Sequence, residues 1–164
     1  MPTPPMAHAE AEQPPATCKE PIDPKEFTDP RYEPGLLRHI VLFRFKDPAA
    51  QKEYTQRFLE LQEKCLRKDG KKYILSIETG TQNSCEQHSR GYQQAFLVTF
   101  QSAGDRNYYV GTPIVTDEQY YDLVHDQYKK DVGAHLEPTP DPPPHPSPGA
   151  NDGALVFDFA IELV

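Results

Sequence analysis

Proline is spread very unevenly along this chain, and that distribution limits where a folded core can form. Of the 18 prolines in 164 residues, nine precede Gly35 and seven lie within residues 137–150. Only Pro48 and Pro113 fall in the stretch between them. Proline fixes φ and has no amide hydrogen, so it interrupts helices and central strands. We therefore expect regular structure between the two proline-rich segments and after the second one.

This pattern divides the chain into two unequal parts. Residues 1–35 have too little apolar surface to fold alone, and we expect a partly disordered extension there. Ile22, Phe27 and Tyr32, in the second half of this extension, are expected to pack onto the domain. The remainder, residues 36–164, is long enough for one hydrophobic core and too short for two domains.

Charge and composition exclude several classes of protein. Aspartate and glutamate number 25 against 17 lysines and arginines, which gives a net charge of −8 and argues against nucleic-acid or anionic-membrane partners. No apolar run approaches the roughly 20 residues of a membrane-spanning helix, and the N-terminus lacks a secretory signal pattern. The three cysteines are scattered and no glycine-rich phosphate loop is present. We therefore expect a cytoplasmic protein with no metal site and no cofactor.

Hydrophobic periodicity predicts a regular succession of strands and helices. Alternation with period two indicates a strand, and apolar residues three and four apart indicate a helix. Asp47 and Thr116 are typical helix N-caps, and Gly70 is expected to end the first helix just after Arg67 and Lys68. The patterns predict strands within 36–45, 73–79, 92–100 and 154–164, long helices at 48–68 and 117–132, and a short helix at 102–109.

Without the short helix, the order is strand, helix, strand, strand, helix, strand. That order predicts an α+β fold, the ferredoxin-like βαββαβ unit with a four-stranded antiparallel sheet. Helices would cover one face of the sheet, yet both faces of the first strand, LLRHIVLFRF (36–45), are largely apolar. We therefore expect a homodimer in which two sheets pack face to face as a dimeric α+β barrel.

Five short segments carry a family pattern, and they occur in the family's order. They are RHIVLFRFKD (38–47), QQAFLVTFQS (93–102), RNYYV (106–110), VHDQYKKDVGAHL (124–136) and VFDF (156–159). In these segments the chain resembles the stress-responsive A/B barrel (Dabb) family, whose members are dimeric α+β barrels. The resemblance covers about residues 36–135 and 153–162, and it marks insertions at about 111–123 and 137–152.

The family is functionally mixed, so its fold assigns no single activity. Some members are stress-induced proteins, and one plant member is a cofactor-free polyketide cyclase of the olivetolic acid cyclase type. By resemblance, the first-strand histidine of that cyclase corresponds to His39, and the histidine that opens its second long helix corresponds to His125. The tyrosine of its short helix corresponds to Tyr109 or, one residue earlier, to Tyr108. Thr112 departs from the pattern, because many members carry histidine there.

These residue types suit carbon–carbon bond formation through an enolate. Histidine can accept a carbon-bound proton near neutral pH, which makes His125 the candidate base, with Asp122 or Asp126 to orient it. The tyrosine hydroxyl and His39 would polarise a carbonyl. Both histidines also have a structural interpretation, His39 as a core residue and His125 as a helix-surface residue. The substrate pocket is expected to be lined by Val41, Phe43, Tyr54, Phe58, Phe96, Val98 and Tyr121.

The first hypothesis for function is a cofactor-independent cyclase, of aldol type or a related ring closure, acting on a small apolar polyketide-like substrate in secondary metabolism. The alternative, from another class, is a non-catalytic stress-responsive or ligand-binding dimer. An isomerase, a decarboxylase or a pericyclase could use the same side chains on the same scaffold.

Overall fold

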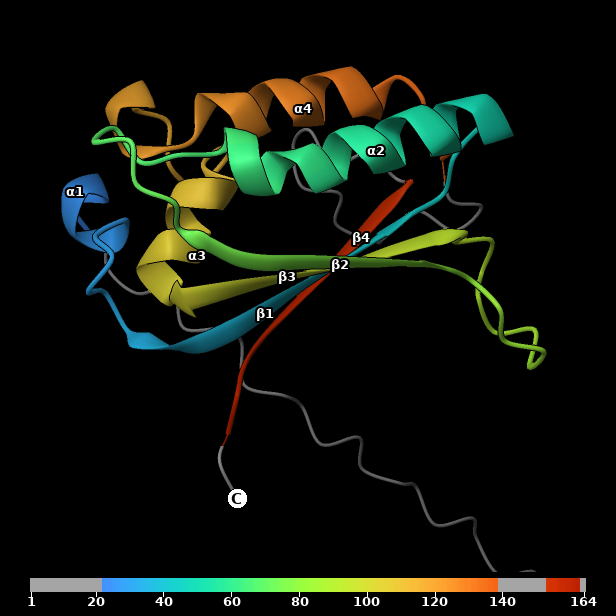
Figure 1. The fold of residues 1–164 in the computed structure, drawn as a ribbon, viewed down its shortest axis with the longest axis horizontal. Coiled ribbons are helices and arrows are strands. Elements are labelled where there is room, and N and C mark those ends of the chain that lie inside the picture. Colours follow the sequence, from blue (N-terminus) through green and yellow to red (C-terminus); the bar gives the residue numbers. More distant parts are fainter. Residues whose placement is uncertain (1–21, 139–152, 163–164) are drawn as a thin grey trace, which may run out of the picture.

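The computed structural model describes residues 22–138 and 153–162, which form one sheet with helices on one side of it (Figure 1). The strands are β1 Pro34–Phe43, β2 Ile74–Thr81, β3 Gln94–Ser102 and β4 Ala154–Ala160. They lie in the order β2-β3-β1-β4, and every neighbouring pair is antiparallel. This arrangement confirms the predicted α+β, ferredoxin-like fold.

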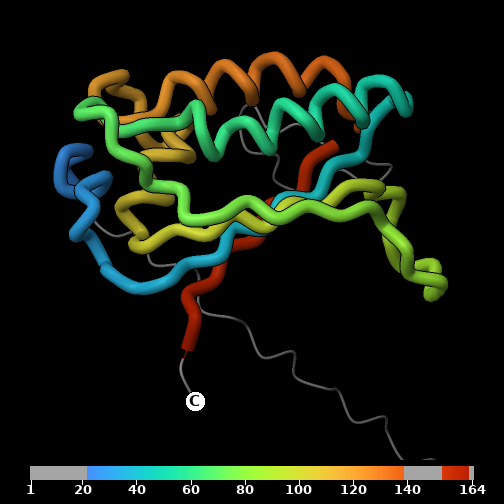
Figure 2. Tube along the Cα trace, in the orientation of Figure 1, coloured from blue at the N-terminus to red at the C-terminus, as the bar shows by residue number. Residues whose placement is uncertain are grey.

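The longer helices all cover the same face of the sheet. Two of them, α2 Pro48–Lys64 and α4 Leu123–Gly133, run side by side above the strands, and α3 Ala103–Val110 follows directly on the end of β3 (Figure 2). The opposite face of the sheet has no helix over it within the described residues (Figure 1). The remaining helical segments among the described residues are α1 Pro24–Phe27 and the 3₁₀ turn η1 Glu118–Tyr120. None of these helices has the length and apolarity needed to span a bilayer.

The hydrophobic core lies between the sheet and α2, α3 and α4. Alternate residues of β1, among them Val41 and Phe43, point toward the helices and are buried. Phe58 of α2 stacks on Phe96 of β3 with ring centroids 3.9 Å apart, and Phe43 meets both rings edge-on. Because burying an aliphatic or aromatic side chain contributes about 1.5–3 kcal/mol, this cluster is a main source of stability.

The second long helix begins six residues later than the sequence predicted, so the prediction of a helix at 117–132 was wrong at its start. Asp122, not Thr116, is the N-cap of α4, and its carboxylate accepts hydrogen bonds from the amides of Val124 and His125. Asp117 instead caps the 3₁₀ turn before it. Two acidic caps compete in this segment, and the one whose side chain becomes buried sets the helix start.

The first long helix is shorter than predicted, because it ends at Lys64 and not near Lys68. Cys65 is extended, and Leu66 forms an isolated antiparallel bridge with Lys72, so the chain reverses here in a turn. Gly70 occupies this turn with φ of +81°, a left-handed conformation that glycine adopts without strain. The predicted stop residue is thus a turn residue.

Three strands differ from their predicted bounds by one or two residues at each end, whereas β4 ends at Ala160, before the predicted end at 164. The predicted faces of the strands agree with the structure. β1 begins at Pro34 and ends at Phe43, while Phe45 pairs separately with Leu136 in an isolated bridge. Of the predicted unstructured parts, residues 1–21 and 139–152 lie outside the described residues.

Residues 22–33 dock against the start of α3. The Asn107 side-chain amide donates to the carbonyl oxygen of Phe27 (2.7 Å), and the amide of Gly104 donates to that of Tyr32 (3.1 Å). The Tyr32 side chain packs against the core. Gly104 permits this approach, since a Cβ there would lie 1.8 Å from the carbonyl oxygen of Asp29.

Replacing Gly104 should therefore release this N-terminal arm. Alanine ordinarily stabilises a helix by about 0.5–1 kcal/mol relative to glycine, but Gly104→Ala should destabilise, because its methyl group collides with the Asp29 backbone. Hydrogen–deuterium exchange should show faster exchange over residues 27–33 in this variant. Gly80→Ala is the control, because a Cβ at Gly80 meets nothing within 4 Å. Unchanged exchange in Gly104→Ala would contradict the docking.

Candidate functional site

Three of the predicted site residues meet on the helix side of the sheet. The ring of Tyr109 stacks on the imidazole of His125 with centroids 3.6 Å apart, and His39 meets the edge of Tyr109 at 5.7 Å. Their relative exposures are 4% for His39, 0% for Tyr109 and 6% for His125. Side chains from β1, α3 and α4 thus form one buried cluster, which we call the histidine–tyrosine cluster.

Local capping positions two members of this cluster. The hydroxyl of Ser102 accepts from the amide of Asp105 and starts α3, whose second turn carries Tyr109. The Asp122 carboxylate starts α4, whose first turn carries His125. The same carboxylate accepts a hydrogen bond from the hydroxyl of Tyr73 at 2.7 Å. The N-terminal turn of α4 is therefore fixed to the segment that leads into β2.

The hydrogen bond at Nδ1 fixes the tautomer of His125. Nδ1 lies 2.6 Å from the carbonyl oxygen of Tyr109, which can only accept, so Nδ1 carries a hydrogen and Nε2 is the acceptor of the neutral ring. Burial, and then the positive charge of Lys129, lower the pKa of His125 well below its usual value. His125 is therefore neutral at pH 7, in the protonation state of a general base.

His39 pairs with a carboxylate from the last strand. Its Nδ1 lies 2.6 Å from Oδ1 of Asp158, whose other oxygen accepts from the guanidinium of Arg106. Burial opposes ionisation of Asp158, but the hydrogen bond and charge of His39, with the charge of Arg106, lower its pKa overall. Asp158 is thus ionised and orients His39 by accepting its Nδ1 hydrogen.

The hydroxyl of Tyr109 is fully buried and has no hydrogen-bond partner among the described residues. Burial raises the pKa of Tyr109 well above 10, and the nearby Cys65, Tyr128 and Asp122 raise it further. The hydroxyl therefore keeps its proton and can act only as a neutral hydrogen-bond donor or acceptor. An unpaired buried hydroxyl costs roughly 1–3 kcal/mol, which marks this atom as unusual for a purely structural residue.

The other candidate tyrosine, Tyr108, does not join the cluster. Its ring packs edge-on against Tyr73 and under the guanidinium of Arg67, 4.3 Å from the ring centroid. Its hydroxyl donates to the carbonyl oxygen of Leu66. Arg67 also pairs with Asp105, so Tyr108 belongs to a contact between α3 and the turn after α2.

The side chains that were predicted to line a pocket pack against one another. Six of the seven, all except Tyr121, are members of the hydrophobic core. Tyr54, also in the core, lies against Tyr128 and His135, and Tyr121 packs on Gly111 in the loop before α4. The space that the sequence analysis assigned to a substrate is therefore filled in this conformation.

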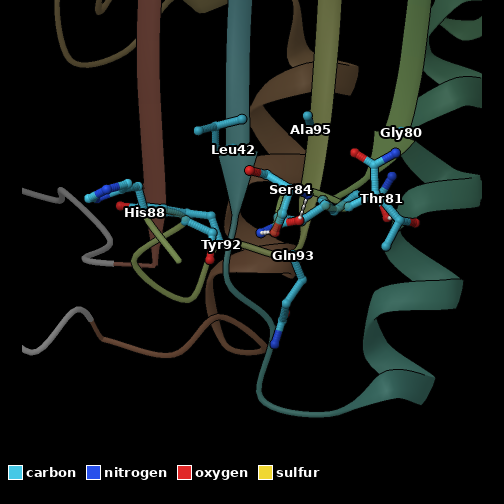
Figure 3. A pocket seen from close by; sticks show the side chains of 12 residues that line it. Leu42, Gly80, Thr81, Ser84, His88, Tyr92, Gln93 and Ala95 are labelled. Carbon is cyan, nitrogen blue, oxygen red and sulfur yellow. Dashed lines mark hydrogen bonds between the residues drawn. The ribbon is translucent and has the colours of Figure 1, made fainter. Parts of the chain in front are cut away.

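Clefts do exist elsewhere on the described part of the chain. Three have volumes of about 450, 810 and 350 Å³, and none is lined by a member of the histidine–tyrosine cluster. The first lies on the open face of the sheet beside the β2–β3 hairpin loop. Figure 3 shows Leu42 and Ala95 on adjacent strands there, with His88 and Tyr92 from the loop at one side. Within residues 22–138 and 153–162, no group of three or more histidines, cysteines or acidic residues is placed to hold a metal ion.

Sequence reasoning missed Asp158 and Arg106, although one signal for Asp158 was present. The apolar strand VFDF (156–159) carries a single charge, and alternation puts Asp158 on the face opposite Phe157 and Phe159. A lone carboxylate on the inner face of a strand needs a partner. Its cross-strand neighbour is His39, a pairing that only the register reveals.

Comparison with known proteins places this architecture in a family. The family model for the stress responsive A/B barrel domain (Dabb) matches residues 37–136, and the chain belongs to that family. A search of curated proteins returns no match.

Solved structures show the same fold at low sequence identity. A hydroxynitrile lyase from Passiflora edulis is 17% identical, with a TM-score of 0.55, over 80% of this chain and 97% of that one. A protein from Arabidopsis thaliana is 20% identical, with a TM-score of 0.54, over 78% of this chain and 97% of that one. A dimeric ferredoxin-like protein from a Jannaschia species is 19% identical, with a TM-score of 0.52, over 77% of this chain and 100% of that one. At these identities the likeness is one of fold, and at least one protein with this fold is an enzyme.

Acid should destabilise the protein through His125. Because the pKa of His125 is depressed in the folded state, the unfolded chain binds the proton more readily once the pH falls below the ordinary value of 6.5. Above that pH, titration of the imidazole does not change the free energy of unfolding. Below it, the free energy of unfolding falls by up to about 1.4 kcal/mol per pH unit.

Urea unfolding between about pH 7 and about pH 5.5 measures this loss. His125→Gln should lose less stability over that interval than the wild-type protein. His88→Gln removes an exposed histidine and should keep the wild-type slope. An identical slope in wild-type protein and His125→Gln would show that His125 is not held neutral.

Proposed function

We propose that this protein is a cofactor-independent cyclase that closes a ring in a small, apolar, polyketide-like substrate by an aldol-type step. The observation that supports it is the meeting of His39, Tyr109 and His125 in one buried cluster, with Nδ1 of both imidazoles fixed by hydrogen bonds. Burying three side chains that can take up or donate a proton costs free energy. Clusters of this kind are found mainly at functional sites, which supports a catalytic role.

Each group has a role that its environment favours. Neutral His125 accepts a proton at Nε2 from the carbon beside a carbonyl, which leaves an enolate. The neutral Tyr109 hydroxyl donates a hydrogen bond to the oxygen on which negative charge develops. The enolate carbon bonds to a second carbonyl carbon of the same chain, and protonated His125 returns its proton to the new alkoxide. His39, oriented by Asp158, polarises the carbonyl that is attacked.

Substitution of the base tests this role. Linear poly-β-ketone chains of graded length serve as substrates, and cyclised product is followed by mass spectrometry. Wild-type protein should exceed the buffer rate, and His125→Gln should lower turnover by about 10²–10⁴-fold because it removes the proton acceptor. His88→Gln, outside the cluster, should keep wild-type turnover.

Circular dichroism must show that the His125→Gln variant is folded. Full turnover in a folded His125→Gln protein would overturn the assignment of the base. Tyr109→Phe should also lower turnover, since it removes the donor and keeps the ring that stacks on His125.

A non-catalytic ligand-binding dimer is the second candidate, and the filled core favours it. Phe58, Phe96 and Phe43 occupy the expected substrate space with close ring contacts. On this hypothesis the cluster is a packing feature, wild-type protein shows no turnover on any chain length, and His125→Gln changes only stability. The same substrate panel therefore separates the two functions.

We also propose that the protein is a homodimer joined through the open face of the sheet, in either function. That face carries apolar side chains from both β1 and β4. Ile40 and Leu42 come from β1. Leu155 (40% exposed), Phe157 (59%) and Phe159 (41%) come from β4. An apolar face of this kind is unfavourable in water, and a second copy would cover it on a two-fold axis. The Jannaschia relative is described as dimeric.

A charge on this face should separate the subunits. Phe157→Glu places a carboxylate at the most exposed aromatic position of β4, and burying it in an interface would cost several kcal/mol. Light scattering after size exclusion should give a mass near 37 kDa, twice 18.6 kDa, for wild-type protein and near 18.6 kDa for the variant. Ile114→Glu, at an exposed residue between α3 and η1, should remain dimeric. A monomeric wild-type protein would refute the interface.

A further inference from the structure

The loop between α3 and α4, residues 111–122, folds as a unit of its own. Its ends are joined, because the amide of Asp122 donates to the carbonyl oxygen of Tyr108 at 2.9 Å. Val115 and Tyr121 in this loop are 2% and 5% exposed, yet neither is a member of the hydrophobic core cluster. A loop whose ends are joined, and whose buried side chains are not part of the core cluster, can open without unfolding the core.

Gly111 allows the loop to close tightly. Its φ is +58°, and a Cβ at this position would lie 2.7 Å from the Cβ of Tyr121. The Tyr121 ring therefore packs directly on the backbone at the point where α3 ends. Apart from Val115, most of the remaining loop residues are exposed, and Ile114 is 71% exposed.

The partly buried ammonium group of Lys129 holds the same loop against α4. Nζ of Lys129 donates to the carbonyl oxygens of Val110 (2.7 Å) and Thr112 (2.9 Å) and to the Thr112 hydroxyl (3.2 Å). That hydroxyl in turn donates to Oδ1 of Asp126 at 2.8 Å. Lysine rarely has all its hydrogen bonds within the protein, and these three cap the carbonyl end of α3, where a positive charge is favoured.

Lys129 and His125 lie one turn apart on the same face of α4, and both reach the end of α3. His125 donates to the carbonyl oxygen of Tyr109, next to the Val110 carbonyl that Lys129 binds. The loop also carries Asp122, whose carboxylate caps the turn of α4 that holds His125. Displacing the loop therefore loosens the contacts that hold His125 against Tyr109.

We infer that residues 111–122 are a lid over the histidine–tyrosine cluster and that Lys129, through Thr112 and Asp126, is its latch. The inference rests on the proposed function, since a substrate can reach a cluster that is at most 6% exposed only if a covering segment moves. Val115 and Tyr121 of the lid are not members of the core cluster, so the lid can open about Asp122, its end fixed to Tyr73 and α4, and leave the core intact. Lys129 is accordingly a positioning residue that governs access to His125.

Removing the ammonium group tests the latch. Lys129→Met keeps the length and apolar stem of the side chain and deletes all three hydrogen bonds. Hydrogen–deuterium exchange of residues 111–122 should become about tenfold faster, while β1 and β3 stay at the wild-type rate. Lys130→Met is the matched control: Lys130 pairs with Asp126 at 2.6 Å, is 67% exposed in its side chain and has no bond to the loop.

Chemical access to the histidine gives a second readout. Diethyl pyrocarbonate modifies neutral imidazoles, so modification of His125, located by peptide mass spectrometry, should be faster in Lys129→Met than in wild-type protein or Lys130→Met. Thr112→Val removes only the hydroxyl and should give a smaller increase, which covers the case in which Lys129→Met fails to fold.

Two results would contradict the lid hypothesis. One is exchange of residues 111–122 only through global unfolding, at the rate of the core strands. The other is equal His125 modification in wild-type protein, Lys129→Met and Thr112→Val. Neither measurement depends on turnover. The lid hypothesis can therefore be wrong even if cyclase activity is found, and it can be right even if no substrate is turned over.

Discussion

The carboxylate of Asp122 is the contact on which the arrangement of the helices depends. It is buried and accepts hydrogen bonds from two amides of α4 and from the Tyr73 hydroxyl, while its own amide donates to the end of α3. One residue thus joins α3, α4 and the entry to β2. A buried carboxylate is tolerable only when its oxygens are satisfied, so its partners must keep their positions. His125 owes its location to this constraint.

The histidine–tyrosine cluster combines opposite environments within a few ångströms. His39 faces an ionised carboxylate, Asp158, whereas His125 faces a carbonyl and lies near the cationic Lys129. The second environment keeps the His125 ring neutral, because burial and Lys129 lower the pKa of His125. Two similar side chains in such different surroundings can take different roles in one site. This asymmetry is the feature that most favours a chemical role over a packing role.

Local pattern was sufficient for the fold and insufficient for the details of the site. The alternation in LLRHIVLFRF placed His39 on the inner face correctly, and the element order led to the ferredoxin-like topology. The pairing of His39 with Asp158 depends on strand register, and the filling of the pocket by Phe58 and Phe96 depends on helix–sheet distance. Neither quantity is encoded in a local window of sequence. The competing caps Asp117 and Asp122 show the same limit at the start of α4.

Strand β4 contributes side chains to both faces of the sheet. Asp158 points inward to His39, while its neighbours Phe157 and Phe159 point to the open face. Sliding this strand by a single residue would exchange the two sets of side chains. Any subunit that covers the aromatic side therefore also selects the alignment that supplies the carboxylate to His39. If two copies pair through this face as proposed, dimer formation and the orientation of His39 are thermodynamically linked through one edge strand, and dilution of the protein would weaken both.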